Sequence, residues 1–414
     1  MTAERRSIWT RLAALDRNVR SMGFVSFFAD LSSEMVYPLF PLFVTGVLGA
    51  PAALLGLIEG IAEATASITK LPFGQWSDFI GRRRPFAAGG YGLAAAGKLL
   101  LAVAVVWPLA LAGRFIDRLG KGMRSAPRDA LLAASTRPEE RGIGFGLHRS
   151  MDTLGAVLGP LTALLLIELG VSLRLIFALA AVPGVISVVI IIWFVRERPS
   201  PGCHAAFRLS LPRVSAFRWL LLSALIFGVG NSSDMFILLK AQSIGAGPTG
   251  VILLYVLFNA VYAAVSTPAG HLSDRVGQLP LMLAGYCAFA LVYVGFAVAG
   301  SLWALVGLFA VYGVYIAATE GTSKALVSRV LPAKEHGAGL GMYYTASGVA
   351  SFAASTIGGA LWSAVGSWAT FAYGAGCALL AAMVLGAARL RLGPVAMGSG
   401  QDAMGAERHM ADPL

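Results

Sequence analysis

Acidic side chains that recur inside long apolar stretches are the residues of this chain best suited to chemistry. Asp30 and Glu34 lie four residues apart in the first such stretch, and Glu59 and Glu63 repeat this spacing in the second. On a helix, residues four apart share one face, and a charged group within an apolar span is costly enough to indicate function. Paired carboxylates can bind and release protons or ligate hard and borderline divalent cations.

Basic side chains gather along a predicted helix at residues 108–127. Arg114, Asp117, Arg118, Lys121 and Arg124 fall on one broad face of this helix. Arg114 could pair with an acid of the first or second span and couple the protonation of that acid to gating. Arg118 and Lys121 could bind an anionic substrate, or they could form ion pairs with neighbouring acids.

Other polar residues suited to contacting a solute are spread along the chain. His148 could be a metal ligand or a pH-sensitive group, although a single histidine near a membrane surface is more often structural. The candidates for lining a substrate cavity are Glu59, Glu63, Asp117, Arg118, Asn231, Asp234, Tyr312 and Tyr315. A metal site would instead draw on Asp30, Glu34, Glu59, Glu63, Asp234 and His148.

The composition indicates which elements must position these residues. Of 414 residues, 57% are hydrophobic and only 13% are charged, and the mean hydropathy is +0.74. A soluble domain has nearer a quarter of charged residues, so this is an all-α integral membrane protein. Twelve transmembrane helices are predicted, at residues 22–46, 52–72, 85–106, 108–127, 144–167, 172–194, 217–240, 247–269, 279–299, 302–323, 338–362 and 366–388.

Two polar motifs recur about two hundred residues apart. The sequence Ser-Ser-acid-Met occupies 32–35 and again 232–235, and Gly-x-x-x-Asp-x-x-Gly occupies 74–81 and again 270–277. The chain therefore contains two copies of one membrane unit, and such repeats commonly enclose a central substrate cavity. The predicted parts are an N-terminal arm (1–21), two six-helix bundles (22–194 and 217–388), a linker (195–216) and a disordered tail (389–414).

The basic residues that give the net charge of +11 lie mainly in the predicted loops. Lysine and arginine concentrate in alternate loops, which is the pattern of cytoplasmic loops and not of a nucleic-acid surface. Both termini are therefore expected in the cytoplasm. The three isolated cysteines suggest neither disulfides nor a zinc site. No cleavable signal peptide, catalytic motif or cofactor is expected.

Several motifs resemble those of the major facilitator superfamily. Gly74, Asp78, Gly81 and Arg82 match its loop 2–3 signature, with a degenerate copy at Gly270, Asp274 and Gly277. Gly146, Gly155, Gly159 and Pro160 match its antiporter signature, and Pro38 and Pro41 match the P-x-x-P of drug:proton antiporters. Residues 114–128 resemble an uncharacterised prokaryotic branch loosely associated with nickel-resistance exporters.

This resemblance implies gating roles for the glycine and aspartate motifs. The two aspartates would cap helices of neighbouring spans and hold the inner gate shut, and the glycines of span five would allow close helix packing. Surface turns and ordinary packing are the alternatives. Glu320 and Lys324, four residues apart, would form a further gate pair, while Asp30, Glu34 and Arg114 would couple protons to transport.

Three functions are compatible with these residues. The leading hypothesis is a proton-coupled exporter of a small solute or toxic compound, monomeric and located in a prokaryotic cytoplasmic membrane. A second hypothesis keeps the fold and transports nickel, cobalt or iron. The third is a non-transporting membrane sensor or assembly factor. The partners expected are a small-molecule or ion substrate, protons and the lipid bilayer, without nucleic acid.

Overall fold

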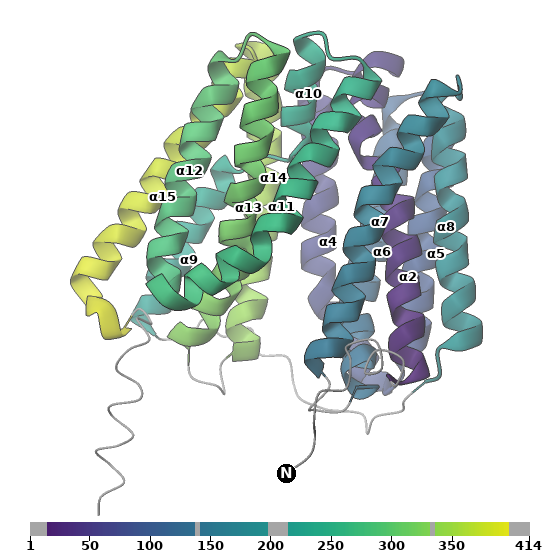
Figure 1. The fold of residues 1–414 in the computed structure, drawn as a ribbon, viewed down its shortest axis with the longest axis horizontal. Helices are drawn as coiled ribbons and strands as arrows, with labels where there is room; N and C mark the ends of the chain where they lie inside the picture. The colour runs from purple at the N-terminus through teal and green to yellow at the C-terminus, as the bar shows by residue number, and fades with distance from the viewer. Residues whose placement is uncertain (1–14, 137–140, 198–213, 332–335, 397–414) are drawn as a thin grey trace, which may run out of the picture. The chain divides into compact units, whose positions relative to one another are not determined.

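A computed structural model describes residues 15–136, 141–197, 214–331 and 336–396, and every regular element in these ranges is a helix. Figure 1 shows the helices as long rods that run alongside one another within each half of the chain. The N-terminal arm up to residue 14, the linker at 198–213 and the tail beyond 396 lie outside the described residues.

The first half of the chain forms six spans. They are α2 (Arg17–Glu34) continued by η1 (Tyr37–Leu39), α3 (Phe40–Leu42) and η2 (Phe43–Val47), then α4 (Ala52–Ile80), α5 (Arg84–Ala102), α6 (Trp107–Ala134), α7 (Arg141–Glu168) and α8 (Leu173–Phe194). The first span is thus broken. Pro38 lacks an amide hydrogen and its ring opposes the carbonyl of the residue four positions earlier, so α2 ends at Glu34.

The second half repeats this plan. It contains α9 (Ser215–Gly230) and α10 (Met235–Ser243), then α11 (Pro248–Val276), α12 (Gln278–Val298), α13 (Leu302–Val330), α14 (His336–Ala364) and α15 (Ser367–Ala396). The seventh span is broken at residues 231–234, so both copies of the Ser-Ser-acid-Met repeat stand at a helix break. The predicted spans at 22–46 and 217–240 are therefore each interrupted by a helix break, and all twelve predicted spans coincide with helical segments.

The helix pairs that pack together are equivalent in the two halves. In the first half, α5 packs on α6 and α8, and α2 packs on α7 and α8. In the second half, α12 packs on α13 and α15, and α9 packs on α14 and α15. Each pair in one half has its counterpart in the other, as duplication of one unit requires.

The chain divides into two compact units. The first contains α2, most of α4, α5 to α8 and the start of α11 at residues 247–252. The second contains α9, α10, the rest of α11 and α12 to α15, together with residues 51–60 at the start of α4.

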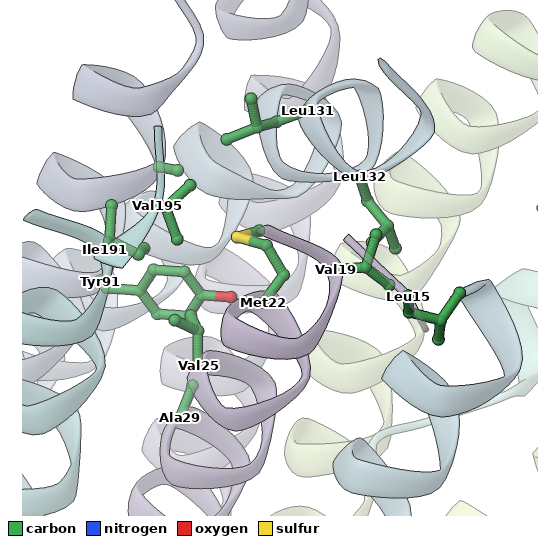
Figure 2. Packing of buried hydrophobic residues seen from close by; sticks show 11 residues of the cluster. Leu15, Val19, Met22, Val25, Ala29, Tyr91, Leu131, Leu132, Ile191 and Val195 are labelled. Atoms are coloured by element: carbon green, nitrogen blue, oxygen red, sulfur yellow. The ribbon is translucent and has the colours of Figure 1, made fainter. Parts of the chain in front are cut away.

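An apolar cluster fixes the helices of the first unit at one end (Figure 2). It joins α2, α5, α6 and α8 through Leu15, Val19, Met22, Val25, Ala29, Ala87, Tyr91, Leu131, Leu132, Ile191 and Val195. Most of these side chains are fully buried, so the cluster holds the ends of these four helices together within the unit. The charged residues Glu34 of α2 and Arg114, Asp117 and Arg118 of α6 lie further along each helix, away from this cluster.

Nine helical stretches among the described residues are long and apolar enough to cross a membrane. The helices α5, α6 and α14 are not among them, and α6 carries Arg114, Asp117, Arg118, Lys121 and Arg124 within its length. The helices α4, α11 and α13 extend past the predicted spans, to Ile80, Val276 and Val330. The Gly-x-x-x-Asp motifs therefore begin inside the last turns of α4 and α11 and not in free loops.

Candidate functional site

A buried network of charges occupies the centre of the first unit. Lys98 Nζ on α5 donates to Asp117 Oδ1 on α6 at 2.9 Å. Arg114 Nη1 and Arg118 Nε lie 3.6 and 3.9 Å from Asp117 Oδ2, and Arg118 Nε lies 3.6 Å from Glu63 Oε1 on α4. One carboxylate is thus surrounded by three bases, and Arg118 connects it to the acidic face of the second span.

The broken first span supplies rings to the same network. The guanidinium of Arg114 lies 5.4 Å from the ring centroid of Tyr37 and 5.2 Å from that of Phe40, and the guanidinium of Arg118 lies 6.0 Å from the centroid of Tyr37. Both arginines are within the range of cation–π attraction. Arg114 lies on Asp117 one turn further along its own helix, and Arg118 forms an ion pair with Glu63 of span two. The expected pairing of Arg114 with an acid of span one or two stays a prediction.

The glycines of span five lie against the acidic face of the first span. A Cβ on Gly155 would lie 3.1 Å from Asp30 Cβ and 2.9 Å from the backbone nitrogen of Leu31. A Cβ on Gly159 would lie 2.8 Å from Glu34 Cβ. A Cβ on Gly146, by contrast, would meet nothing within 4 Å. Of the three signature glycines, Gly155 and Gly159 are therefore required for α7 to pack closely against α2 at Asp30 and Glu34.

The second unit contains a pocket of about 290 Å³. Rings and polar groups line it: Phe227, Asn231, Asp234, Met282, Tyr286, Tyr312, Tyr315, Ile316, Thr319, Glu320, Ser323 and Tyr343. The hydroxyl of Tyr312 donates to Asp234 Oδ1 at 2.6 Å, and the hydroxyl of Tyr262 donates to Glu320 Oε2 at 2.6 Å. The pocket thus contains two carboxylates among aromatic side chains, Asp234 at the break between α9 and α10 and Glu320 on α13.

The predicted cavity residues are divided between these two places. Asn231, Asp234, Tyr312 and Tyr315 lie together on the pocket, whereas Glu63, Asp117 and Arg118 belong to the ion-pair network. Glu59 is fully buried in the segment that groups with the second unit, where Ser233 Oγ donates to its Oε2 at 3.5 Å.

The loop 2–3 motif forms a tight turn. Gly81 has φ +70°, and its repeat equivalent Gly277 has φ +90°, a region that residues with a side chain rarely adopt. Arg83 Nη2 lies 3.0 Å from Asp78 Oδ1, while the amides of Arg83 and Arg84 donate to the carboxylate of Glu197. The cap at the start of α5 is therefore Glu197, and Asp78, which was expected to cap a neighbouring helix, pairs with Arg83.

Other predicted gate residues are only partly described. Pro160 lies inside α7, Gly74 packs α4 against Ala126 of α6, and Arg82 is exposed. The side chains of Lys324 and Asp274 and the surroundings of Gly270 lie outside the described set, so the expected pair of Lys324 with Glu320 stays a prediction.

The metal hypothesis can be compared with the positions of its proposed ligands. Within the described residues, no group of three or more histidine, cysteine, aspartate and glutamate side chains is placed to hold a metal ion. His148 is buried, and its Nε2 has no hydrogen-bond partner among those residues.

Sequence reasoning missed two important residues. Apart from Arg84 at its first residue, α5 carries Lys98 as its one charged residue, and such a residue inside a span is itself a functional signal. Tyr286 lines the pocket and stacks on Phe227, with ring centroids 4.2 Å apart. Its place in the pocket had no signal in sequence spacing, because it comes from a helix without neighbouring charges.

The duplicated six-span units, broken helices and buried charges define a multi-pass membrane transporter and not an enzyme. The model of the Major Facilitator Superfamily matches residues 22–241 and 220–410. The chain belongs to this superfamily and is a secondary transporter.

Individual relatives agree with this assignment. The chain is 36% identical to an uncharacterized MFS-type transporter of Methanocaldococcus jannaschii, over 90% of this chain and 94% of the relative. It is 22% identical to the multidrug resistance protein MdtH of Salmonella arizonae, over 81% of each. The crystal structure of a POT family transporter in complex with a thioalcohol conjugated peptide shares its fold, with a TM-score of 0.78, 12% identity, and coverage of 92% and 99%.

Proposed function

We propose that this protein is a proton-coupled exporter of a small solute or toxic compound. The observation that carries the proposal is the packing of Gly155 and Gly159, from the antiporter-like signature, against the acidic face of α2 at Asp30 and Glu34. A signature that resembles those of antiporters and the acids suited to proton exchange thus meet in one helix interface. The transporter would work by alternating access, as a monomer, in a prokaryotic cytoplasmic membrane with both termini in the cytoplasm.

The pocket of the second unit is the proposed contact surface for the solute. It combines apolar rings with a few polar groups, as small-molecule sites do, and it lies at a helix break, where transporters commonly bind substrate. The relative named as a multidrug resistance protein supports export as the direction.

The decisive experiment is proton flux in proteoliposomes that contain the purified protein and a pH-sensitive dye. Under an imposed pH gradient, lipophilic cations, organic anions, and nickel, cobalt and ferrous ions are added one at a time. Proton movement with organic solutes supports the proposal, and movement with metal ions alone supports the metal hypothesis instead. An absence of movement with every solute overturns proton coupling and favours a facilitator or a sensor.

Glu34→Gln is expected to abolish proton-coupled transport while leaving expression intact, because Glu34 lies at the break of span one beside Gly159 and glutamine cannot exchange a proton. The same dye assay measures the effect. Transport by this variant at the wild-type level would remove Glu34 from the coupling mechanism.

Tyr312→Phe is expected to weaken the apparent affinity for solute by about tenfold, because Asp234 loses a hydrogen bond of 2.6 Å and such bonds to charged groups contribute about 1.5–3 kcal/mol. The half-saturating solute concentration is the measured quantity. Tyr315→Phe serves as the control, since it removes a hydroxyl from the same pocket and leaves the Tyr312–Asp234 bond in place. Equal loss in the two variants would contradict the positioning role of Tyr312.

A further inference from the structure

The pocket of the second unit has a continuous wall of aromatic rings. The ring of Phe227 stacks on that of Tyr286, with centroids 4.2 Å apart, and its centroid lies 6.2 Å from that of Tyr315. The centroid of Tyr315 lies 5.4 Å from that of Tyr312, and all four side chains line the pocket. Such a wall attracts an apolar body through burial of its surface and a positive charge through the negative faces of its rings.

Two carboxylates line the same pocket, and each is held by a tyrosine from another helix. The hydroxyl of Tyr312 on α13 donates to Asp234 Oδ1 at 2.6 Å, and the hydroxyl of Tyr262 on α11 donates to Glu320 Oε2 at 2.6 Å. An ionised carboxylate has about four acceptor sites. One hydroxyl therefore fixes the position of each carboxylate without removing its charge.

The two acids are held at different levels of the pocket. Tyr312, which donates to Asp234, and Glu320 both belong to α13 and line the pocket. Their positions, 312 and 320, correspond to a separation of about 12 Å along the helix axis. Tyr315 and Ile316 come between these levels on α13 and line the pocket as well. The pocket thus has one acid at the level of Tyr312, another at the level of Glu320, and largely apolar side chains between the two.

The charge of the pocket wall has one sign. Among the residues that the structure describes, the charged side chains of the lining are Asp234 and Glu320. An acidic wall favours a positively charged solute over an anion by electrostatic complementarity. A metal ion fits the wall poorly, since in the described part of the chain no three histidine, cysteine, aspartate or glutamate side chains are placed to hold one. The rings between the two acids fit the carbon skeleton of an organic solute instead.

We propose that this pocket binds an organic solute with two positive charges separated by an apolar stem. The inference rests on the proposed transport function and names the class of solute that the pocket takes. One cationic group lies against Asp234 and the other against Glu320. The stem lies along the rings of Phe227 and Tyr315. A solute with a single charge reaches only one of the carboxylates, and an anion is repelled by both.

Equilibrium binding to the purified protein in detergent, without a proton gradient, tests this inference. The probes are 1,8-diaminooctane, whose amines lie roughly as far apart as the two levels of α13, 1-aminooctane, and the dicarboxylate of the same chain length. Isothermal titration calorimetry, corrected for titration into protein-free micelles, measures each dissociation constant. The diamine should bind about tenfold more tightly than the monoamine, because it makes a second hydrogen bond to a charged group. The dicarboxylate should not bind.

Two variants test the acids separately. Asp234→Asn and Glu320→Gln should each weaken binding of the diamine by about tenfold, because each removes one of the two charges. Asp129→Asn is the control, since it makes the same kind of change at an exposed acid of the first unit, and it should bind the diamine as the wild type does. If a substitution prevents folding, the comparison of the three probes on the wild-type protein still decides the inference.

The outcomes separate the solute class from the function on which it rests. If the diamine binds no more tightly than the monoamine, or if the dicarboxylate binds as tightly, the two-charge solute is overturned, even when the dye assay shows proton movement with another solute. Loss of affinity in only one of the two acid variants assigns binding to a single carboxylate and overturns it as well. Tight binding of the diamine that depends on both acids supports the inference, even when no solute moves protons.

Discussion

Asp117→Asn is expected to lower the free energy of unfolding by about 3–5 kcal/mol, the cost of breaking a buried ion pair. Asp117 is 6% exposed and is the carboxylate closest to Lys98, at 2.9 Å. Arg114 and Arg118 lie on its other oxygen. An amide of the same shape would leave these three bases without that negative charge in a medium that solvates them poorly.

Thermal unfolding in detergent measures this loss. Asp129→Asn is the matched control, because it makes the same chemical change on the same helix at a side chain that is 52% exposed. Exposed pairs contribute at most about 1 kcal/mol, so this variant should unfold close to the wild type. Equal destabilisation by the two substitutions would show that burial does not determine the effect.

Gly155→Ala is expected to reduce transport by about tenfold or more. The new Cβ would lie 2.9 Å from the backbone nitrogen of Leu31, and because backbone cannot rotate away as a flexible side chain can, α2 and α7 must separate. Overpacking of this kind costs about 1–3 kcal/mol, which is enough to favour states in which the two helices are apart. Solute-driven proton movement in proteoliposomes is the measurement.

Gly146→Ala provides a sharp comparison within the same motif. A Cβ at this position would meet nothing within 4 Å, so the variant should transport as the wild type does. Both glycines belong to the same sequence motif, but only Gly155 lies in a close contact with another helix. Strong impairment of Gly146→Ala, or normal transport by Gly155→Ala, would refute the assignment of close approach to Gly155.

The sequence predicted the fold well because the signals involved are local or repeated. Long apolar runs indicated the spans, and the recurrence of residues 32–35 at 232–235 indicated duplication. The breaks in spans one and seven were missed. Pro38 offered a local signal for the first, but the second falls at Asn231–Asp234, where no proline interrupts the helix. There the break follows Gly230, whose added Cβ would strike Cys377, which is a tertiary contact and leaves no pattern in spacing.

For the candidate site, the sequence predicted which charged residues share a helix face, but it did not predict which residues of other helices they contact. Spacing correctly placed Arg114 and Arg118 on one face with Asp117. It could not show that Lys98 from the preceding helix would meet that face, because the relative rotation of two helices depends on which small residues allow them to approach. Gly97 is such a residue, since its Cβ would lie 2.6 Å from the carbonyl oxygen of Gly113.

The pairing of α5 with α6 has a consequence for how the protein is made. At the centre of a bilayer each charged residue of a nascent helix raises the insertion free energy by about 2.5–3.5 kcal/mol, and α6 carries several such residues. On its own, α6 would be rejected by the insertion machinery. Lys98 of α5 offsets one of those charges at 2.9 Å. We therefore expect α6 to enter the lipid more readily together with α5, as one hairpin, than on its own.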